Sequence, residues 1–353
     1  MIAEKKALMK GKEEVRVPEW FYKEIDCGCC GITIAGFMLV ANVLCCVFHL
    51  ILAIIAVSAA VSGGGGLSTP RLQVFLTELV WNANSTNALT PVNVPQEGLY
   101  LAWMTLWFFL LSALAHGIIV LGNWRQCYYG RDDPSARKVT RWSGWYLIWI
   151  HEARQPLRWA EYSISASLMI ITISVASGVA HVYQVTFIFV LMWATMMFGY
   201  YAERLSRPES LGDKRPQRWA INSDSEKDSL IPAVIQRLAP HLWGYVCYIT
   251  VWAVLMHSFF YNVSLGNDAE GGGGGGGPPT FVYIIVVGQL VVFSAFGVTQ
   301  FWNLVREDGP YWYWRGETSY LFLSLFSKGL LGMTLVANVL LYSSFDEAVM
   351  QAD

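Results

Sequence analysis

Apolar residues gather in long stretches along the chain, and shorter polar segments separate one stretch from the next. Seven of the stretches are close to or longer than the ~20 residues that a helix needs to cross the hydrocarbon core of a bilayer. This pattern predicts an all-α membrane protein with a seven-transmembrane-helix bundle. The predicted helices cover residues 36–61, 99–122, 156–179, 183–205, 239–262, 280–304 and 317–342.

Breaks in the apolar pattern divide the chain into three predicted parts. Residues 1–35 form an N-terminal segment, residues 36–342 contain the bundle, and residues 343–353 form a short tail. Glycine runs at 63–66 and 271–277 are predicted to be flexible linkers without chemistry of their own. Hydrophobic residues make up 54% of the chain and charged residues 14%, against about 25% charged residues in soluble domains. This composition excludes an ordinary soluble domain.

The segment between the first two helices is long enough to have a structure of its own. Residues 71–81 are rich in strand-forming residues, residues 82–87 are rich in turn formers, and residues 88–94 could return as a partner strand. We therefore expect a β-hairpin in the first outer loop. Residues 142–149 are aromatic but too short to span a bilayer, and we expect them at the membrane interface.

The basic residues predict how the chain lies in the membrane. Of the 24 Lys and Arg residues, 22 fall before the first helix or in alternate loops on the same side of the bundle. Basic residues favour cytoplasmic loops, so we expect a multi-pass protein with a cytoplasmic N-terminus and an extracellular or lumenal C-terminus. Two candidate glycosylation sites, Asn84 and Asn262, fall on the predicted outer side.

Lys328 is a lysine in the middle of a predicted span. It lies about eleven residues into the last helix, or ~16 Å along its axis. A charged group at this depth is costly and by default marks a functional site. A desolvated amine of this kind can form a Schiff base with an aldehyde cofactor. The alternative interpretation is a structural salt bridge between helices.

Glu161 is the expected partner of Lys328, because it is the one carboxylate well inside a predicted span. Each charge alone would favour its own neutralisation, so an acid and a base at similar depth indicate a pair. Ser165 lies one helical turn after Glu161, and Ser324 lies one turn before Lys328. Either hydroxyl could bind this pair, although Ser165 could equally serve helix packing.

His49 and His116 fall inside the first two predicted spans, and we expect them in the same half of the membrane as Glu161. They could line a polar cavity and accept protons, or they could be ordinary packing residues. The chain shows no metal-ligand spacing, no nucleotide-binding loop, no catalytic-triad spacing and no nucleic-acid motif. We therefore expect neither an enzyme nor a metal or nucleic-acid binding protein.

Three stretches of the sequence resemble the heliorhodopsins, a family of microbial retinal proteins whose N-terminus faces the cytoplasm. They are residues 157–169 (LRWAEYSISASLM), residues 315–328 (RGETSYLFLSLFSK) and residues 198–208 (FGYYAERLSRP). The second stretch matches the family's Ser-x-x-x-Lys attachment motif. The resemblance implies a rhodopsin-like seven-helix fold with all-trans retinal on Lys328, Glu161 as counterion and Ser324 beside the Schiff base.

The same resemblance implies roles for further residues. His49 and His116 would form the cytoplasmic-side polar cavity, and the family tends to form homodimers through the outer loop. Met192, Ser294 and Met333 depart from the Asn, Asn and Trp of the family pattern. The other implied site residues are Arg158 and Tyr162 beside the cavity, Glu203 and Glu317 as cytoplasmic-end carboxylates, and Met169, Trp252, Phe293 and Phe296 in the retinal pocket.

Two functions remain open for such a protein. One is light sensing through a slow photocycle that changes the cytoplasmic face, read by a cytoplasmic signalling partner. The other is light-driven or light-gated proton transport, which requires relay groups on both sides of the Schiff base. Acids lie at Glu161, Glu203 and Glu317, whereas the outer half contains His181 and His257 but no acid. This distribution favours the sensor over the transporter.

Overall fold

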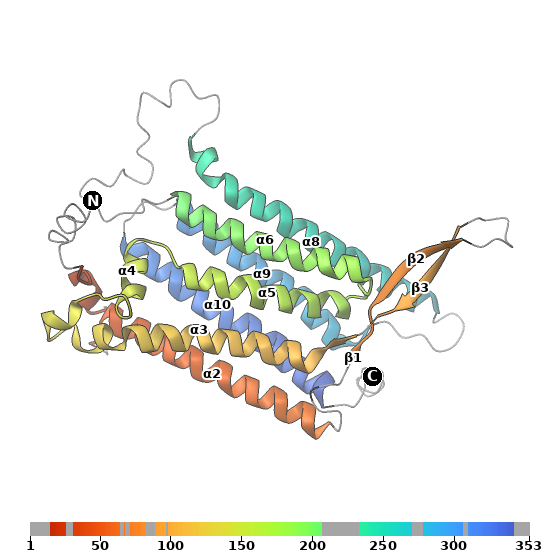
Figure 1. Ribbon diagram of the computed structural model, residues 1–353, viewed down its shortest axis with the longest axis horizontal. Coiled ribbons are helices and arrows are strands. Elements are labelled where there is room, and N and C mark those ends of the chain that lie inside the picture. Colours follow the sequence, from red (N-terminus) through yellow and green to blue (C-terminus); the bar gives the residue numbers. More distant parts are fainter. Residues whose placement is uncertain are drawn as a thin grey trace, which may run out of the picture.

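The computed structural model describes residues 15–25, 31–63, 67, 71–81, 89–96, 98–206, 233–269, 278–305 and 310–341. Within these residues, seven helices are long and apolar enough to cross a membrane, which confirms the predicted seven-helix membrane fold. They run side by side along the long axis of the molecule (Figure 1). These helices are α2 (Ile34–Ser62), α3 (Leu101–Tyr129), α5 (Pro156–Ala176), α6 (Val182–Ser206), α8 (Ala233–Ala269), α9 (Thr280–Val305) and α10 (Pro310–Leu335).

Several helices are longer than their hydropathy predicts. Helix α3 continues beyond residue 122 to Tyr129, and α8 extends in both directions past residues 239–262. Helix α10 begins at Pro310 instead of residue 317, and a π-helical turn, Val336–Leu340, follows it. Hydropathy locates the part of a helix inside the hydrocarbon, while polar and aromatic residues continue the helix outside it. Proline suits the first helical turn because it has no N–H to leave unbonded.

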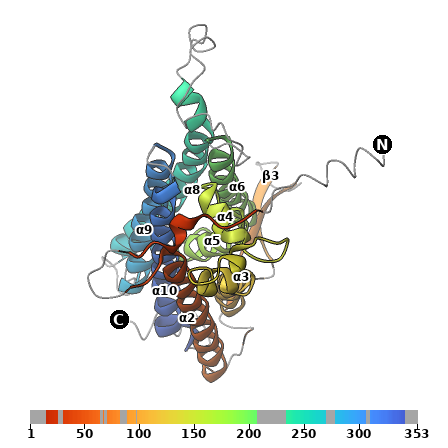
Figure 2. The same ribbon diagram turned by 90° about the vertical axis from the view of Figure 1, so that its left-hand side faces the viewer.

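A short helix, α4 (Trp145–His151), packs against one end of the bundle, which we call the α4 end (Figure 2). Its residues Tyr146, Leu147 and Ile150 are buried. The N-terminal 3-10 helix η1 (Glu19–Tyr22) packs beside it, and Trp20 Nε1 donates a hydrogen bond to His151 Nδ1 at 3.3 Å. The aromatic segment expected at the membrane interface therefore forms part of the protein's own core at this end.

An antiparallel hairpin marks the opposite end of the molecule, which we call the hairpin end (Figure 1). Strand β2 (Phe75–Trp81) pairs with β3 (Leu89–Pro95), and the short strands β1 (Arg71–Leu72) and β4 (Leu99–Tyr100) pair at its base. This confirms the predicted hairpin. The backbone N–H of Phe75 donates to the Ala180 carbonyl at 2.8 Å, which joins the hairpin to the α5–α6 connection.

The two candidate glycosylation sites differ in what the structure describes. Asn84 lies outside the described residues. Asn262 lies within α8, and its Nδ2 donates to the Ser177 carbonyl at 3.1 Å. A Cβ added at Gly178 would come within 1.8 Å of that same nitrogen, so the side chain of Asn262 is closely packed against the end of α5. Glycosylation of either residue stays a prediction.

The bundle has an apolar interior and an apolar exterior. Phe108, Phe109 and Leu255 are buried where the helices meet. Large apolar side chains such as Leu121 and Phe187 point away from the bundle and are exposed. A wide exposed apolar surface marks contact with an apolar phase. The chain is therefore an integral multi-pass membrane protein.

Candidate functional site

Lys328 and Glu161 form a buried ion pair in the middle of the bundle. Lys328 Nζ on α10 lies 3.0 Å from Glu161 Oε1 on α5, and the exposed fractions of the two side chains are 3% and 6%. Two opposite charges can remain ionised in an apolar interior only when they compensate each other. The structure thus brings together the two residues that the sequence predicted as a pair.

Serine hydroxyls complete the immediate surroundings of this pair. Lys328 Nζ donates to Ser324 Oγ at 3.0 Å, as the spacing on α10 predicted. Ser112 Oγ on α3 donates to Glu161 Oε1 at 2.7 Å. Sequence reasoning missed Ser112, although it lies one helical turn before His116 and therefore on the same face of α3. Ser165 is buried, and its Oγ has no partner among the described residues.

Tyr162 connects the ion pair to the α4 end. Its ring centroid lies 4.9 Å from Lys328 Nζ, close enough for a cation–π contact. The Tyr162 hydroxyl donates to the backbone carbonyl of Tyr320 at 3.2 Å. The guanidinium carbon of Arg158 lies 3.9 Å from the centroid of the Tyr320 ring. Two aromatic rings therefore separate the two buried cations.

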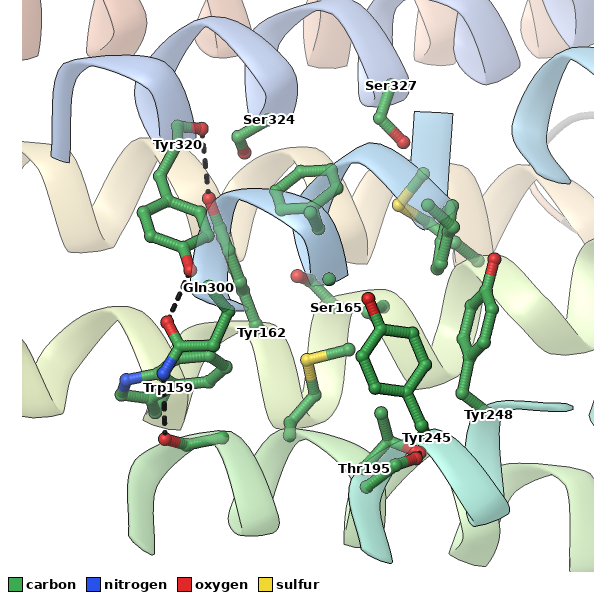
Figure 3. Close-up of a pocket in the computed structure, with 18 of the residues that line it drawn as sticks. Trp159, Tyr162, Ser165, Thr195, Tyr245, Tyr248, Gln300, Tyr320, Ser324 and Ser327 are labelled. Carbon is green, nitrogen blue, oxygen red and sulfur yellow. Dashed lines mark hydrogen bonds between the residues drawn. The ribbon is translucent and has the colours of Figure 1, made fainter. Parts of the chain in front are cut away.

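A cavity opens beside Lys328 between helices α5, α6, α8, α9 and α10, and Figure 3 shows its lining. About 790 Å³ of space not filled by protein atoms lies in it, a volume that includes open solvent at its mouth. Aromatic and apolar side chains dominate its wall, with a few hydroxyl and amide groups among them. Its lining residues are Trp159, Tyr162, Ser165, Ala166, Met169, Thr195, Met196, Gly199, His241, Gly244, Tyr245, Tyr248, Phe293, Phe296, Gly297, Gln300, Tyr320, Ser324, Ser327 and Lys328.

The residues expected in the pocket are only partly those that line it. Met169, Phe293 and Phe296 are in the wall, as the sequence suggested. Trp252 lies outside the lining set, and its buried ring lies behind Phe293 with the two ring centroids 6.0 Å apart. Ser294, a departure from the family pattern, hydrogen-bonds the Tyr248 hydroxyl at 2.8 Å.

His49 and His116 stack on each other, with ring centroids 5.7 Å apart and an interplanar angle of 14°. His49 Nδ1 lies 2.7 Å from the Cys45 carbonyl, so this nitrogen is the donor and Nε2 holds the lone pair. That Nε2 is buried and has no partner among the described residues. His116 Nδ1 lies 2.9 Å from Asn42 Oδ1. The structure therefore brings the two histidines together as predicted and leaves one basic nitrogen without a partner.

Three further ionisable residues meet at the α4 end of the bundle. Arg158 on α5 forms ion pairs with Glu203 on α6 and with Glu317 on α10. The sequence suggested that the two glutamates lie at this end but did not predict that they share one arginine. Within the described residues, no group of three or more His, Cys, Asp or Glu side chains is arranged to hold a metal ion.

Comparison with known proteins places the chain in a family. A family model described as Heliorhodopsin matches residues 38–340. The chain belongs to the heliorhodopsin family. Among solved structures, the transmembrane domain of Salpingoeca rosetta rhodopsin phosphodiesterase is similar at 12% identity and a TM-score of 0.48, over 85% of this chain and 83% of that chain. No curated protein sequence matches the chain.

Heliorhodopsins are light-responsive proteins that bind retinal, and this heliorhodopsin has a site that fits such a chromophore. Covalent attachment of an aldehyde requires a primary amine, and Lys328 provides one at the cavity wall. A positive charge on the resulting linkage needs an anion, and the Glu161 carboxylate already lies within 3.0 Å of that nitrogen. A polyene needs an apolar wall, which the aromatic lining supplies.

Proposed function

We propose that this heliorhodopsin is a light-sensing receptor in which Lys328 carries retinal and Glu161 is the counterion. The observation that carries this proposal is the buried Lys328–Glu161 pair at the wall of an aromatic-lined cavity. Retinal, all-trans in the dark and joined to Nζ as a protonated Schiff base, would supply light absorption and isomerisation. The protein's own residues determine what happens to the charge and the proton at that nitrogen.

Glu161 stabilises the positive charge at Nζ, because a charge pair in a medium of low polarity interacts strongly. Ser112 donates to the same carboxylate oxygen, which fixes the orientation of the carboxylate. Ser324 lies at hydrogen-bond distance from Nζ. The Glu161 anion would hold the proton on the nitrogen in the dark, and burial of all four groups keeps water away from it.

The stacked histidines offer a temporary place for a proton that leaves Nζ after illumination. His49 Nε2 is the buried, unpartnered base described above. A proton held there would stay inside the bundle, and its return to Nζ would be slow, as a slow photocycle requires. Changes at the α4 end, where Arg158 joins three helices, would then present the light signal to a cytoplasmic partner.

This proposal includes the orientation and assembly expected from the sequence. The α4 end would face the cytoplasm and the hairpin end the extracellular or lumenal side, in a homodimer surrounded by lipid. Protease protection of an N-terminal tag in sealed vesicles tests the orientation. A tag protected inside right-side-out vesicles supports it, and a tag that protease removes from them contradicts it.

Covalent attachment is tested by adding all-trans retinal to the apoprotein. The wild-type protein should develop an absorption band in the visible, and Lys328→Ala should remain colourless, because no other described amine reaches the cavity. Lys138→Ala, which removes a lysine outside the cavity lining, should form pigment normally. A coloured Lys328→Ala protein with its retinal covalently bound would disprove the attachment site.

A further inference from the structure

The Arg158 cluster contains one cation and two acids. The side chains of Arg158, Glu203 and Glu317 are 5%, 3% and 3% exposed. If both carboxyl groups were ionised, the cluster would hold a net negative charge in the protein interior. An uncompensated buried charge is strongly unfavourable, and a carboxyl group usually avoids it by taking up a proton. Charge balance therefore indicates one proton shared between two acids.

The hydrogen-bond donors distinguish the two acids. Glu203 Oε1 accepts from Arg158 and from the Tyr313 hydroxyl at 2.9 Å. Glu203 Oε2 accepts from Trp159 Nε1 at 2.8 Å and from the backbone N–H of Gln155 at 3.1 Å. Four donors point at two oxygens, an arrangement that stabilises a carboxylate. A protonated Glu203 would have to direct its own hydrogen at one of these donors.

Glu317 has a poorer set of donors. Its Oε2 accepts from Arg158, and the Tyr146 hydroxyl lies at a long 3.4 Å from its Oε1, while the side-chain amide of Gln155 is also close to this carboxyl group. Burial holds the pKa of Tyr146 well above its ordinary value, so this phenol remains neutral. The 3.4 Å separation leaves room for a hydrogen on Glu317 Oε1, and the Tyr146 hydroxyl, the donor in this contact, would then accept that hydrogen.

No second cation compensates Glu317 among the described residues around it. Helix α4 presents Tyr146, α5 presents Arg158 and α6 presents Glu203. On α10, Arg315 lies two positions before Glu317 but is exposed, and its guanidinium carbon lies 5.8 Å from the centroid of the Trp314 ring. Lys328 is paired with Glu161. A chain of polar contacts runs from Tyr146 to His116. Asn42 Nδ2 donates to the Tyr146 oxygen at 3.3 Å, and Asn42 Oδ1 lies 2.9 Å from His116 Nδ1.

We propose that Glu317 is a second proton-binding site, which holds a proton in the dark while Glu203 is the anion of Arg158. Polar contacts through Tyr146 and Asn42 connect this site to His116. The site goes beyond the proposed attachment of retinal and does not depend on it. Loss of the Glu317 proton would leave two carboxylates facing one guanidinium, which would weaken the contacts that join α5, α6 and α10.

Infrared spectroscopy of protein labelled with ¹³C-carboxyl glutamate tests this assignment, with and without added retinal. At neutral pH, the dark protein should show the carbonyl stretch of a protonated glutamate, and Glu317→Gln should lose that band. Glu78→Gln, at an exposed position of the hairpin, is the matched control and should retain it. No such band in the wild-type protein, or a band that survives Glu317→Gln, would overturn the proposal.

Thermal stability assigns the proton to one of the two acids. Glutamine imitates a protonated acid, so Glu317→Gln should fold and keep the wild-type unfolding midpoint. Glu203→Gln should lower the midpoint, because an amide cannot accept all four donors. A destabilised or unfolded Glu317→Gln protein, or a Glu203→Gln protein of wild-type stability, contradicts the assignment. If the protein stays colourless with retinal but shows the carbonyl band of a protonated glutamate, the proposed chromophore is wrong and the Glu317 assignment still stands.

Discussion

One oxygen atom, Oε1 of Glu161, receives both of the donors that define the site. Lys328 Nζ lies 3.0 Å from it and Ser112 Oγ lies 2.7 Å from it. Two charge-assisted hydrogen bonds to one oxygen hold this carboxylate in a fixed orientation. Substitutions at these residues should therefore change the absorption spectrum of the pigment, because they alter the charges around Lys328 Nζ.

Replacement of the counterion should change both colour and proton affinity. In Glu161→Gln, the positive charge at Nζ loses its anion, so the visible band should move to longer wavelength. The pH at which the linkage loses its proton should fall by about 1–3 pH units, as expected when an opposite charge is removed at close range. Absorption spectra recorded across a pH titration measure both effects, with the exposed Glu78→Gln as control. An unchanged titration would remove Glu161 from this role.

Ser112 should stabilise the fold through its hydrogen bond to Glu161. Without this hydroxyl, the buried carboxylate loses a hydrogen bond worth about 1.5–3 kcal/mol. In Ser112→Ala, the thermal unfolding midpoint should therefore be lower than in the wild type. Ser167→Ala is the control, since its Oγ bonds the Ser163 carbonyl within α5. Equal midpoints of the two variants would show that Ser112 has no such effect.

The sequence predicts residues at this scale when their chemistry is unusual for their position. Lys328 and Glu161 could be predicted because a charged residue within an apolar span is energetically costly and usually has a functional role. Ser112 could not, because serine is common in membrane helices and its partner lies 49 positions away on another helix. Trp252 was assigned to the pocket from the family pattern, but it lies behind the lining residue Phe293, which separates it from the cavity.

At the scale of helices, α3 and α10 approach each other closely at Gly332. A Cβ added at this residue would lie 2.1 Å from Phe109 Cζ, far inside van der Waals contact. At Gly329, less than one turn earlier on α10, the nearest side-chain atom is Phe48 Cζ at 3.5 Å, an ordinary contact. The absence of a side chain at Gly332 therefore allows Phe109 to fill the space between these helices near Lys328.

Gly332→Ala should destabilise the protein although alanine favours helix formation. Overpacking against the buried Phe109 ring should cost about 1–3 kcal/mol. Gly329→Ala should be neutral or stabilising by up to ~1 kcal/mol, because it has the same gain in helix propensity without the collision. Thermal unfolding midpoints, followed by loss of the visible band, compare the two variants. The same midpoint for both would show that the two helices can separate without cost.

The sequence predicts the existence of elements better than their ends. Hydropathy located all seven spans and the strand pattern located the hairpin. Hydropathy placed the start of the last span at residue 317, whereas α10 begins at Pro310. The residues between them include the buried Tyr313, which binds Glu203 across the helix interface. Tertiary contacts of this kind extend a helix beyond its apolar part, and local composition does not reveal them.

At the scale of the whole molecule, buried charge is distributed unevenly along the bundle axis. Among the described residues, the buried charged side chains are the central pair and the three residues of the Arg158 cluster at the α4 end. On the hairpin side of Lys328, the buried polar residues described by the structure are neutral, for example Thr105 and Ser177. A proton could be exchanged towards the α4 end but meets no buried acid among the described residues towards the hairpin.

This asymmetry predicts the absence of sustained proton transport. Transport needs groups that take up and release protons on both sides of the membrane-buried nitrogen. In a voltage-clamped cell that expresses the protein with retinal, continuous light should therefore produce no steady current. The Lys328→Ala protein, which should not respond to light, is the control. A brief charge displacement at the onset of light is compatible with proton movement confined to the α4 side. A current that persists during illumination and follows the proton gradient would instead establish the transporter, and an exit route would then have to form in the light.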